Sequence, residues 1–293
     1  MPRWPLRSLW LTAGLAMAQA APPVVRSEML VSTAWLSDHL KDPNLVLLHV
    51  AETFADYKRG HIPGARFLAT GTFIDNAGSL GSELPSAELL TRTFSNLGLT
   101  ENSRIVIYAT AWMPNAARAY LTLDFLGFGG RIALLDGGIE QWLGEDRPVT
   151  MVVPTYKPAS FTPKVRTEVI ATLEDVKRVV EAPVGQHAWQ LVDSRPAKRY
   201  GAGHLAGAAS VYWLETLSSE EHPTFLPPEK LRALLVSRGL VPDKKAITYC
   251  EVGLQASHGY FLLRYLGYEA ALFDGSYQAW SGAKLPVLTG AGP

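Results

Sequence analysis

The chain of 293 residues contains one cysteine, Cys250, and it stands where a catalytic loop would hold it. Residues 246–249 have the composition of a strand, and residues 255–257 open a helical pattern. The loop between them is short enough to direct several backbone N–H groups at one point, and a helix start adds partial positive charge. Both effects favour the thiolate, the nucleophilic form of cysteine. We therefore interpret Cys250 as a candidate nucleophile; the alternative is a small buried apolar residue.

The sequence repeats itself in the same order in its two halves. Each half carries an apolar strand, a Tyr-x-x-Gly-His motif, a second strand, and an Asp-Gly motif that ends in tryptophan. Four matched segments in one order indicate a duplicated domain. The matched pairs are 45–50 with 190–193, 57–65 with 200–208, 105–109 with 246–250, and 133–142 with 271–280.

The duplication predicts an N-terminal domain at 21–150 and a C-terminal domain at 169–293. The segment between them, 151–168, is rich in proline and has little periodicity, so we expect a semi-extended linker. Each half alternates short Val/Ile/Leu-rich strands with amphipathic helices. That pattern predicts two α/β domains, each with a mostly parallel sheet flanked by helices. Two helices are expected in the second half, one capped by Thr172 and one from Pro228 to Gly239.

Residues 1–20 have the organisation of an export signal. Arg3 and Arg7 precede an apolar run that is shorter than the roughly 20 residues a spanning helix needs, and small residues follow it. We predict cleavage after this segment and a periplasmic location; the alternative is a retained N-terminal anchor. The 27 basic and 27 acidic residues balance, so the charge favours neither nucleic acid nor, after cleavage, a membrane as partner.

Three motifs in order give the chain a family resemblance. They are the Asp-x-Arg that begins at Asp193 with the Tyr-x-x-Gly-His that follows it, the Cys-x-x-Gly-x-Gln that begins at Cys250, and the Leu-Phe-Asp-Gly ending. Over residues 28–288 the chain resembles rhodanese in its tandem-domain form. The resemblance implies a sulfurtransferase with a catalytic C-terminal domain and an N-terminal domain that has lost its thiol. Ala109 indeed stands at the position of Cys250.

The resemblance also implies a mechanism. Thiosulfate is a small dianion whose outer sulfur is attacked by the Cys250 thiolate, which leaves a persulfide on the enzyme as sulfite departs. An amide nest would stabilise first the thiolate and then the anionic persulfide. The backbone N–H groups expected to form this nest are those of Glu251, Val252, Gly253, Leu254 and Gln255.

Several side chains near the motifs have expected roles. Arg199 is expected to bind the sulfonate end of the donor, as the matching arginine does in the family; the alternative is a solvated charge. Asp193 is expected to orient the structure around the loop, and Arg195 to pair with a carboxylate. His204 is expected to hold a turn, because the half without a cysteine carries the same histidine as His61.

The N-terminal half has lost more than its thiol. From the aligned motifs, Val50 is expected where the second half has Asp193, and Asp56 where it has Arg199. We interpret this domain as catalytically inactive and structural.

The loop of the N-terminal half also carries bulky residues. Trp112, Met113 and Pro114 would obstruct an amide nest. Trp112 and Met113 are expected in the core between the domains, or else as a wall of the catalytic cleft.

Glu251 leaves the identity of the donor open. A carboxylate next to the cysteine would repel a dianion and raise the pKa of the thiol, unless it is paired or points away. Thiosulfate is favoured because the small-residue loop of mercaptopyruvate-using members is not matched, and 3-mercaptopyruvate is the alternative. The acceptor is a thiophile such as cyanide, a small thiol or a protein thiol.

Other classes of protein fit the motifs less well. A phosphatase or arsenate reductase of this kind needs Cys-x5-Arg, and Ala256 occupies the arginine position. A non-catalytic sulfur-binding or interaction module remains an alternative. We expect no cofactor and no metal, because one cysteine without a further ligand at suitable spacing cannot furnish a coordination shell.

Overall fold

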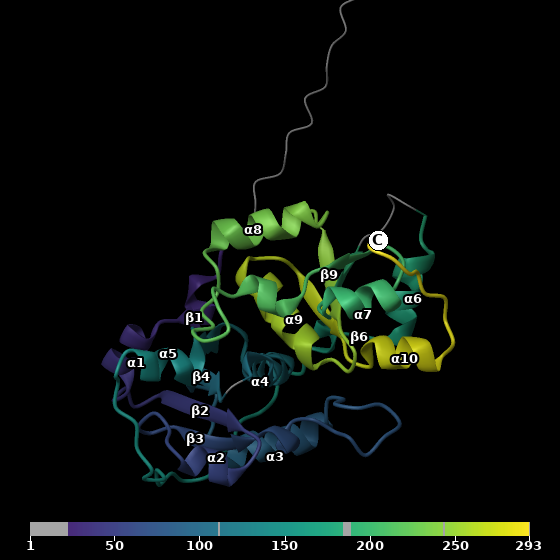
Figure 1. The fold of residues 1–293 in the computed structure, drawn as a ribbon. Coiled ribbons are helices and arrows are strands. Elements are labelled where there is room, and N and C mark those ends of the chain that lie inside the picture. Colours follow the sequence, from purple (N-terminus) through teal and green to yellow (C-terminus); the bar gives the residue numbers. More distant parts are fainter. Residues whose placement is uncertain (1–22, 111, 184–188, 243, 293) are drawn as a thin grey trace, which may run out of the picture.

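The computed structural model describes residues 23–110, 112–183, 189–242 and 244–292, so the predicted export signal lies outside the described residues. It contains two five-stranded sheets with helices on both faces (Figure 1). All named strand pairs are parallel. The prediction of two duplicated α/β domains is therefore confirmed.

The N-terminal sheet has the strand order β1-β5-β4-β2-β3. Its central strands are apolar and β-branched, and they are buried almost throughout, as expected for a parallel sheet covered on both faces. The strands are β1 (Leu30–Val31), β2 (Leu45–Ala51), β3 (Arg66–Ala69), β4 (Arg104–Ala109) and β5 (Ile132–Leu135). The helices are α1 (Thr33–His39), α2 (Phe54–Lys58), α3 (Ala87–Asn96), α4 (Met113–Phe125) and α5 (Gly138–Gly144), with short 3₁₀ turns at Ser27–Met29, Thr70–Thr72 and Gly129–Arg131.

The C-terminal sheet repeats this order as β6-β10-β9-β7-β8. The strands are β6 (Ile170–Ala171), β7 (Trp189–Asp193), β8 (Ala208–Ser210), β9 (Lys245–Tyr249) and β10 (Ala270–Phe273). The helices are α6 (Leu173–Glu181), α7 (Ala197–Ala202), α8 (Pro228–Ser237), α9 (Leu254–Tyr265) and α10 (Ser276–Gly282), with 3₁₀ turns at Thr167–Val169 and Trp213–Thr216. Thr172 caps α6 as predicted, in a capping box with Asp175. Residues 151–166 form neither helix nor strand.

The duplication extends to individual hydrogen bonds. The indole Nε1 of Trp142 donates to the carbonyl oxygen of Pro148 at 2.9 Å. In the second copy Trp280 donates to Pro286 at the same distance. The tryptophan that ends each repeat therefore anchors the chain after the last helix of its domain.

The strand register corrects one sequence prediction. Asp193 pairs with Tyr249, the residue before Cys250, and in the first copy His49 pairs with Tyr108. His49, not Val50, therefore occupies the position of Asp193. The prediction was wrong because the first copy has one more residue between this strand and the tyrosine of the next motif, which shifts an alignment made from the motif.

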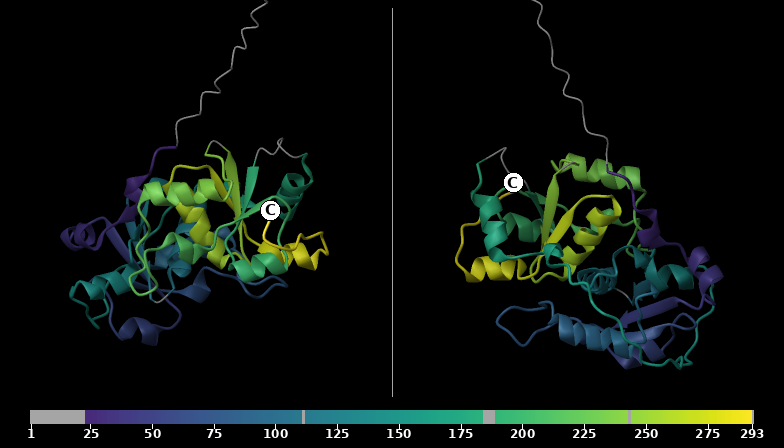
Figure 2. Two further views of the ribbon diagram at one scale, coloured as in Figure 1. Left: turned by 45° about the horizontal axis from the view of Figure 1, so that its top comes forward. Right: turned by 180° about the vertical axis from the view of Figure 1, so that it is seen from behind.

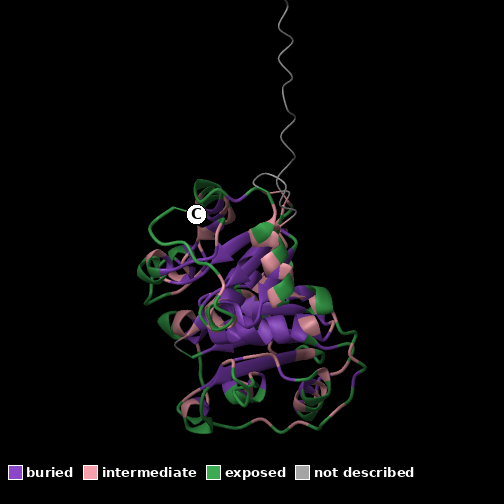
Figure 3. Cartoon of the chain, turned by 90° about the vertical axis from the view of Figure 1, so that its right-hand side faces the viewer, coloured by how far each residue is buried: buried purple, intermediate pink, exposed green. Residues whose placement is uncertain are grey.

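The two domains share one apolar core. Helices α4 and α9 pack against each other between the sheets (Figures 1 and 2). The rings of Tyr120 and Phe261 meet edge to face across this contact, with centroids 5.0 Å apart. Figure 3 shows the buried layer continuing through the middle of the molecule. Met113 lies in this shared core, as one of the two sequence interpretations expected.

Each domain sends a segment over the other. The first crossover segment, residues 74–86, runs between β3 and α3 and is closed by a bridge between Asp75 and Glu83. In Figure 1 it is the blue loop that extends toward α10. The backbone N–H of Leu84 donates to Asp274 Oδ2 of the C-terminal domain at 2.6 Å.

The second crossover segment, residues 217–225, is the pseudosymmetric counterpart. It is closed by a bridge between Leu217 and Phe225. The backbone N–H of Phe225 donates to Asp136 Oδ1 of the N-terminal domain at 2.9 Å. Each crossover segment thus covers the edge of the partner sheet at which an active site would form.

Within the described part of the chain, none of the helices has the length and apolar character required to span a bilayer.

Candidate active site

Cys250 follows β9 directly and precedes α9, so it lies at the carboxyl edge of the sheet. Gly253 caps α9 with a φ of 87°, in the left-handed region that favours glycine. A side chain at this position would also stand 2.9 Å from the carbonyl oxygen of Asp274. The helix starts at Leu254, one residue earlier than predicted.

Backbone N–H groups act on the sulfur of Cys250 against the effect of burial. Burial raises the pKa of the thiol from its ordinary value. The backbone N–H groups of Ala256, Val252, Gly253 and Gln255 lower it by a smaller amount. The N–H groups of Val252, Gly253 and Gln255 thus act on the thiol in the expected direction, but burial outweighs their effect.

Ala256 was not named from the sequence as a member of the nest, although its backbone N–H also lowers the pKa of the thiol. Ala256 lies in the first turn of α9, where backbone N–H groups have no partner inside the helix. A prediction that stops where the loop ends misses such donors.

The backbone of Cys250 is held by α10. The N–H of Cys250 donates to Ser276 Oγ at 3.2 Å, and this hydroxyl donates to the carbonyl oxygen of Phe273 at 2.8 Å. Ser276 was not singled out from the sequence. Its role could have been suspected from the aligned repeats, because Ser276 in the half with the cysteine corresponds to Gly138 in the half without it.

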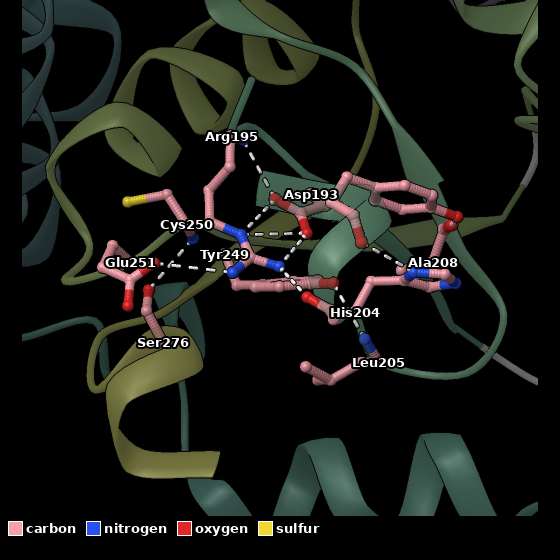
Figure 4. Close-up of polar contacts among 11 residues, drawn as sticks. Asp193, Arg195, His204, Leu205, Ala208, Tyr249, Cys250, Glu251 and Ser276 are labelled. Atoms are coloured by element: carbon pink, nitrogen blue, oxygen red, sulfur yellow. Dashed lines mark hydrogen bonds and ion pairs between the residues drawn. The ribbon is translucent and has the colours of Figure 1, made fainter. Parts of the chain in front are cut away.

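Arg195 links the strand β7 to the loop that follows Cys250. Its Nη2 donates to Asp193 Oδ2 at 2.6 Å and to the carbonyl oxygen of Gly203 at 2.6 Å (Figure 4). Burial lowers the pKa of Arg195, but the hydrogen bonds and charge of Asp193 raise it above its ordinary value overall. The predicted pairing of Arg195 with a carboxylate is therefore confirmed, and Asp193 fixes the guanidinium in place.

The same guanidinium reaches Glu251. Nη1 of Arg195 lies 3.4 Å from Glu251 Oε2, and the Glu251 side chain is 49% exposed. The carboxylate that raised doubt about the donor is thus paired with a cation and partly solvated. Both features weaken its repulsion of an anion at the loop.

Arg199 and His204 are two further residues whose roles were predicted from the sequence. Arg199 is exposed on α7 and forms no ion pair with any residue that the structure describes. His204 stacks on Tyr200 at 3.8 Å, and its Nδ1 lies 3.0 Å from the Tyr200 carbonyl oxygen. The turn-holding contact expected of His204 is present.

Arg118 brings the N-terminal domain into contact with the loop that follows Cys250. From α4, its Nη1 donates to Asp274 Oδ1 at 2.6 Å and its Nη2 to the carbonyl oxygen of Ser82 at 2.6 Å. The guanidinium is fully buried, and Nη1 is 3.5 Å from where a Cβ on Gly253 would stand. Arg118 thus ties the first crossover segment to the aspartate beneath the loop, and local sequence patterns gave no sign of this contact.

The first crossover segment covers the loop itself. The N–H of Gly81 donates to Gln278 Oε1 at 2.9 Å, and a Cβ on Gly81 would stand 3.6 Å from Val252. Cys250 is 1% exposed beneath this cover. No cluster of three or more His, Cys, Asp or Glu with the arrangement of a metal site occurs among the described residues.

Comparison with known proteins decides the family. The model of the rhodanese-like domain matches the chain twice, at residues 32–145 and 176–283. The chain belongs to the rhodanese family. Each match covers all strands of one sheet except its first, β1 or β6, so this rhodanese consists of two copies of the domain that face each other through α4 and α9.

Relatives of this rhodanese align over nearly their whole length. The sulfur carrier protein TtuD of Thermus thermophilus is 30% identical over 90% of this chain and 97% of its own. A relative from Synechococcus elongatus that carries a thiosulfate sulfurtransferase name is 30% identical over 96% of this chain and 89% of its own. The crystal structure of the Escherichia coli 3-mercaptopyruvate enzyme SseA has a TM-score of 0.76 and 25% identity, covering 85% of this chain and 98% of that one. These names support a sulfurtransferase.

His258, on α9 of this rhodanese, makes stability depend on pH. The Thr216 hydroxyl donates to the Trp213 carbonyl oxygen, so it accepts from His258 Nε2 at 2.8 Å. Burial lowers the pKa of His258 to about 3, and the imidazole is neutral in the folded protein. The unfolded chain takes up a proton below about pH 6.5, so stability falls as the pH drops from that value toward the folded pKa.

We expect His258 to account for about 2 kcal/mol of the stability lost between pH 7 and pH 5. Urea unfolding of His258→Gln at both pH values should therefore show a smaller difference than in the original protein. His222→Gln, which changes an exposed histidine, is the control. An equal pH dependence in His258→Gln and the original protein would contradict this role.

Proposed function

We propose that the protein transfers sulfane sulfur from thiosulfate to a thiophilic acceptor through a persulfide on Cys250. The observation that carries the proposal is the position of the chain's only cysteine between the carboxyl end of β9 and the start of α9, where backbone N–H groups of four residues lower the pKa of its thiol. Such N–H groups stabilise negative charge on the sulfur before and after transfer.

In the proposed reaction the Cys250 thiolate attacks the outer sulfur of thiosulfate. A sulfur–sulfur bond forms to the enzyme as the one inside thiosulfate breaks, and sulfite leaves with the bonding electron pair. The acceptor then attacks the outer sulfur of the persulfide. With cyanide the products are thiocyanate and the free thiolate, which closes the cycle.

Two observations bear on the donor. The pairing of Glu251 with Arg195 reduces the repulsion of a dianion, which supports thiosulfate. The similarity to the Escherichia coli 3-mercaptopyruvate sulfurtransferase, 26% identical over 88% of this chain, supports 3-mercaptopyruvate as the second candidate.

Steady-state formation of thiocyanate from cyanide with each donor separates these candidates. We expect kcat/KM to be at least about tenfold higher for thiosulfate, which corresponds to about 1.4 kcal/mol of transition-state binding. The opposite preference would assign 3-mercaptopyruvate as donor while leaving the persulfide mechanism in place. No turnover with either donor would favour a sulfur-binding or interaction module.

We further propose that Arg199 binds the anionic end of the donor. It is a solvent-exposed cation on α7, the helix that follows the Asp193–Arg195 pair, and no described residue neutralises it. Arg199→Ala is expected to raise the KM for thiosulfate about tenfold, since a hydrogen bond to a charged group contributes about 1.5–3 kcal/mol. Lys198→Ala removes a neighbouring exposed charge and is the control. Equal KM values in the two variants would exclude Arg199 from the donor site.

The acceptor and the location are proposed on separate grounds. The similarity to a sulfur carrier protein supports a protein thiol as one acceptor, beside cyanide and small thiols. Export to the periplasm is proposed from the composition of residues 1–20 alone.

A further inference from the structure

A cavity of about 270 Å³ lies in the N-terminal domain at the place where the C-terminal domain holds Cys250. It opens beside Ala109, at the carboxyl end of β4, and is bordered by Gly137 and Gly138 at the start of α5. The second crossover segment contributes to its wall, as the first one covers Cys250. The cavity is therefore the pseudosymmetric counterpart of the catalytic site.

Two indole rings form an aromatic corner in this cavity. Trp112 comes from the N-terminal domain and Trp213 from the C-terminal domain. Their rings are perpendicular, with centroids 6.3 Å apart. Met113, Leu214 and Leu217 are among the other apolar residues of the wall. A cation within about 6 Å of an indole face is attracted by the ring, and thioethers are polarisable neighbours.

The charges in the cavity wall have one sign. Glu140 and Glu220 line it, and none of its described lining residues is basic. Oε2 of Glu140 lies 3.1 Å, and the carbonyl oxygen of Ala109 3.4 Å, from where a Cβ on Gly138 would stand. The Glu140 carboxylate and the backbone of Ala109 thus both lie close to Gly138. In the catalytic repeat the residue that matches Glu140 is the uncharged Gln278.

We propose that this cavity binds a small organic cation, such as an alkylated ammonium group on a short chain. The carboxylates supply the charge, the indoles supply the faces that a methylated cation prefers, and the volume limits the ligand to a compact one. The two repeats would then bind ligands of opposite charge, an anionic sulfur donor at Cys250 and a cation beside Ala109.

Calorimetric titration of the full chain with choline, and with its neutral isostere 3,3-dimethyl-1-butanol, tests the proposal. Choline is expected to bind at least about tenfold more tightly than the alcohol, because only the cation gains the carboxylate and cation–π interactions. Glu140→Gln and Trp112→Leu are each expected to weaken choline binding at least about fivefold. Trp189→Leu, which changes a half-buried tryptophan elsewhere, is the control for loss of an indole.

Equal affinity for choline and the alcohol would overturn the proposal, as would no binding of choline to the original protein. Glu140→Gln preserves shape, so an unchanged affinity in this variant would also overturn it even if Trp112→Leu failed to fold. The titration is repeated with Cys250→Ser, where choline is expected to bind as in the original protein. The outcome is thereby independent of the sulfur-transfer reaction.

Discussion

Replacement of Cys250 by serine is expected to reduce thiocyanate formation by at least about 10³-fold, because a hydroxyl is a far weaker nucleophile than a thiol at neutral pH. The substitution is nearly isosteric, so the unfolding free energy is expected to change by no more than about 1 kcal/mol. Initial rates with cyanide and urea unfolding curves measure the two effects. Substantial residual turnover in the folded Cys250→Ser protein would show that another group carries the sulfur.

The N-terminal domain offers a matched control for this prediction. The double variant Ala109→Cys/Cys250→Ser places a thiol at the equivalent strand end. There the neighbours are Gly138 in place of Ser276 and a proline in the first turn of α4. We expect this variant to stay inactive, because the thiol lacks the environment built around Cys250. Recovery of turnover would show that the loop around Cys250 is dispensable.

The second large effect is expected from Arg118→Met. This change leaves Asp274 without its buried cation. Asp274 accepts a hydrogen bond from the backbone N–H of Leu84 and lies beneath the loop that follows Cys250. Removing one partner of a buried ion pair costs about 3–5 kcal/mol of unfolding free energy. Turnover is expected to fall as well, since the first crossover segment and the loop lose their common anchor. Urea unfolding and initial rates at a temperature where the variant is folded measure both.

Two further variants isolate the ion pair. Asp274→Asn in the Arg118→Met background removes the unpaired charge and keeps an acceptor for Leu84, so it should recover most of the lost stability. Arg59→Met breaks an exposed pair with Asp56 and should change stability too little to measure. Equal effects of Arg118→Met and Arg59→Met on stability and turnover would contradict the role of the Arg118–Asp274 ion pair in holding the loop that follows Cys250.

The sequence predicted most of what is local or repeated. The duplication, the parallel sheets and the position of Cys250 between a strand and a helix follow from periodicity and motifs. The pairing of Arg195 with Asp193 lies within one such motif. Each of these features is visible in short segments of the chain, so it can be recognised from the sequence alone.

What the sequence did not reveal depends on contacts between distant segments. The ion pair between Arg118 and Asp274 joins α4 to the residue that follows β10. The register that places His49 opposite Tyr108 depends on the pairing of β2 with β4. The pKa of Cys250 is another example: the loop predicts a lowered value, whereas burial beneath the first crossover segment and the helices raises it. Burial is a property of the packed protein and has no local signature.

The central claim is that Cys250 carries sulfur as a persulfide, and the mass of the intact protein tests it most directly. After incubation with thiosulfate and removal of excess reagent, the protein is expected to gain the mass of one sulfur atom and to lose it on addition of cyanide, while Cys250→Ser gains nothing. If the mass stayed unchanged in both incubations, with thiosulfate and with 3-mercaptopyruvate, the account would be contradicted. An equal gain of mass in Cys250→Ser would contradict it as well.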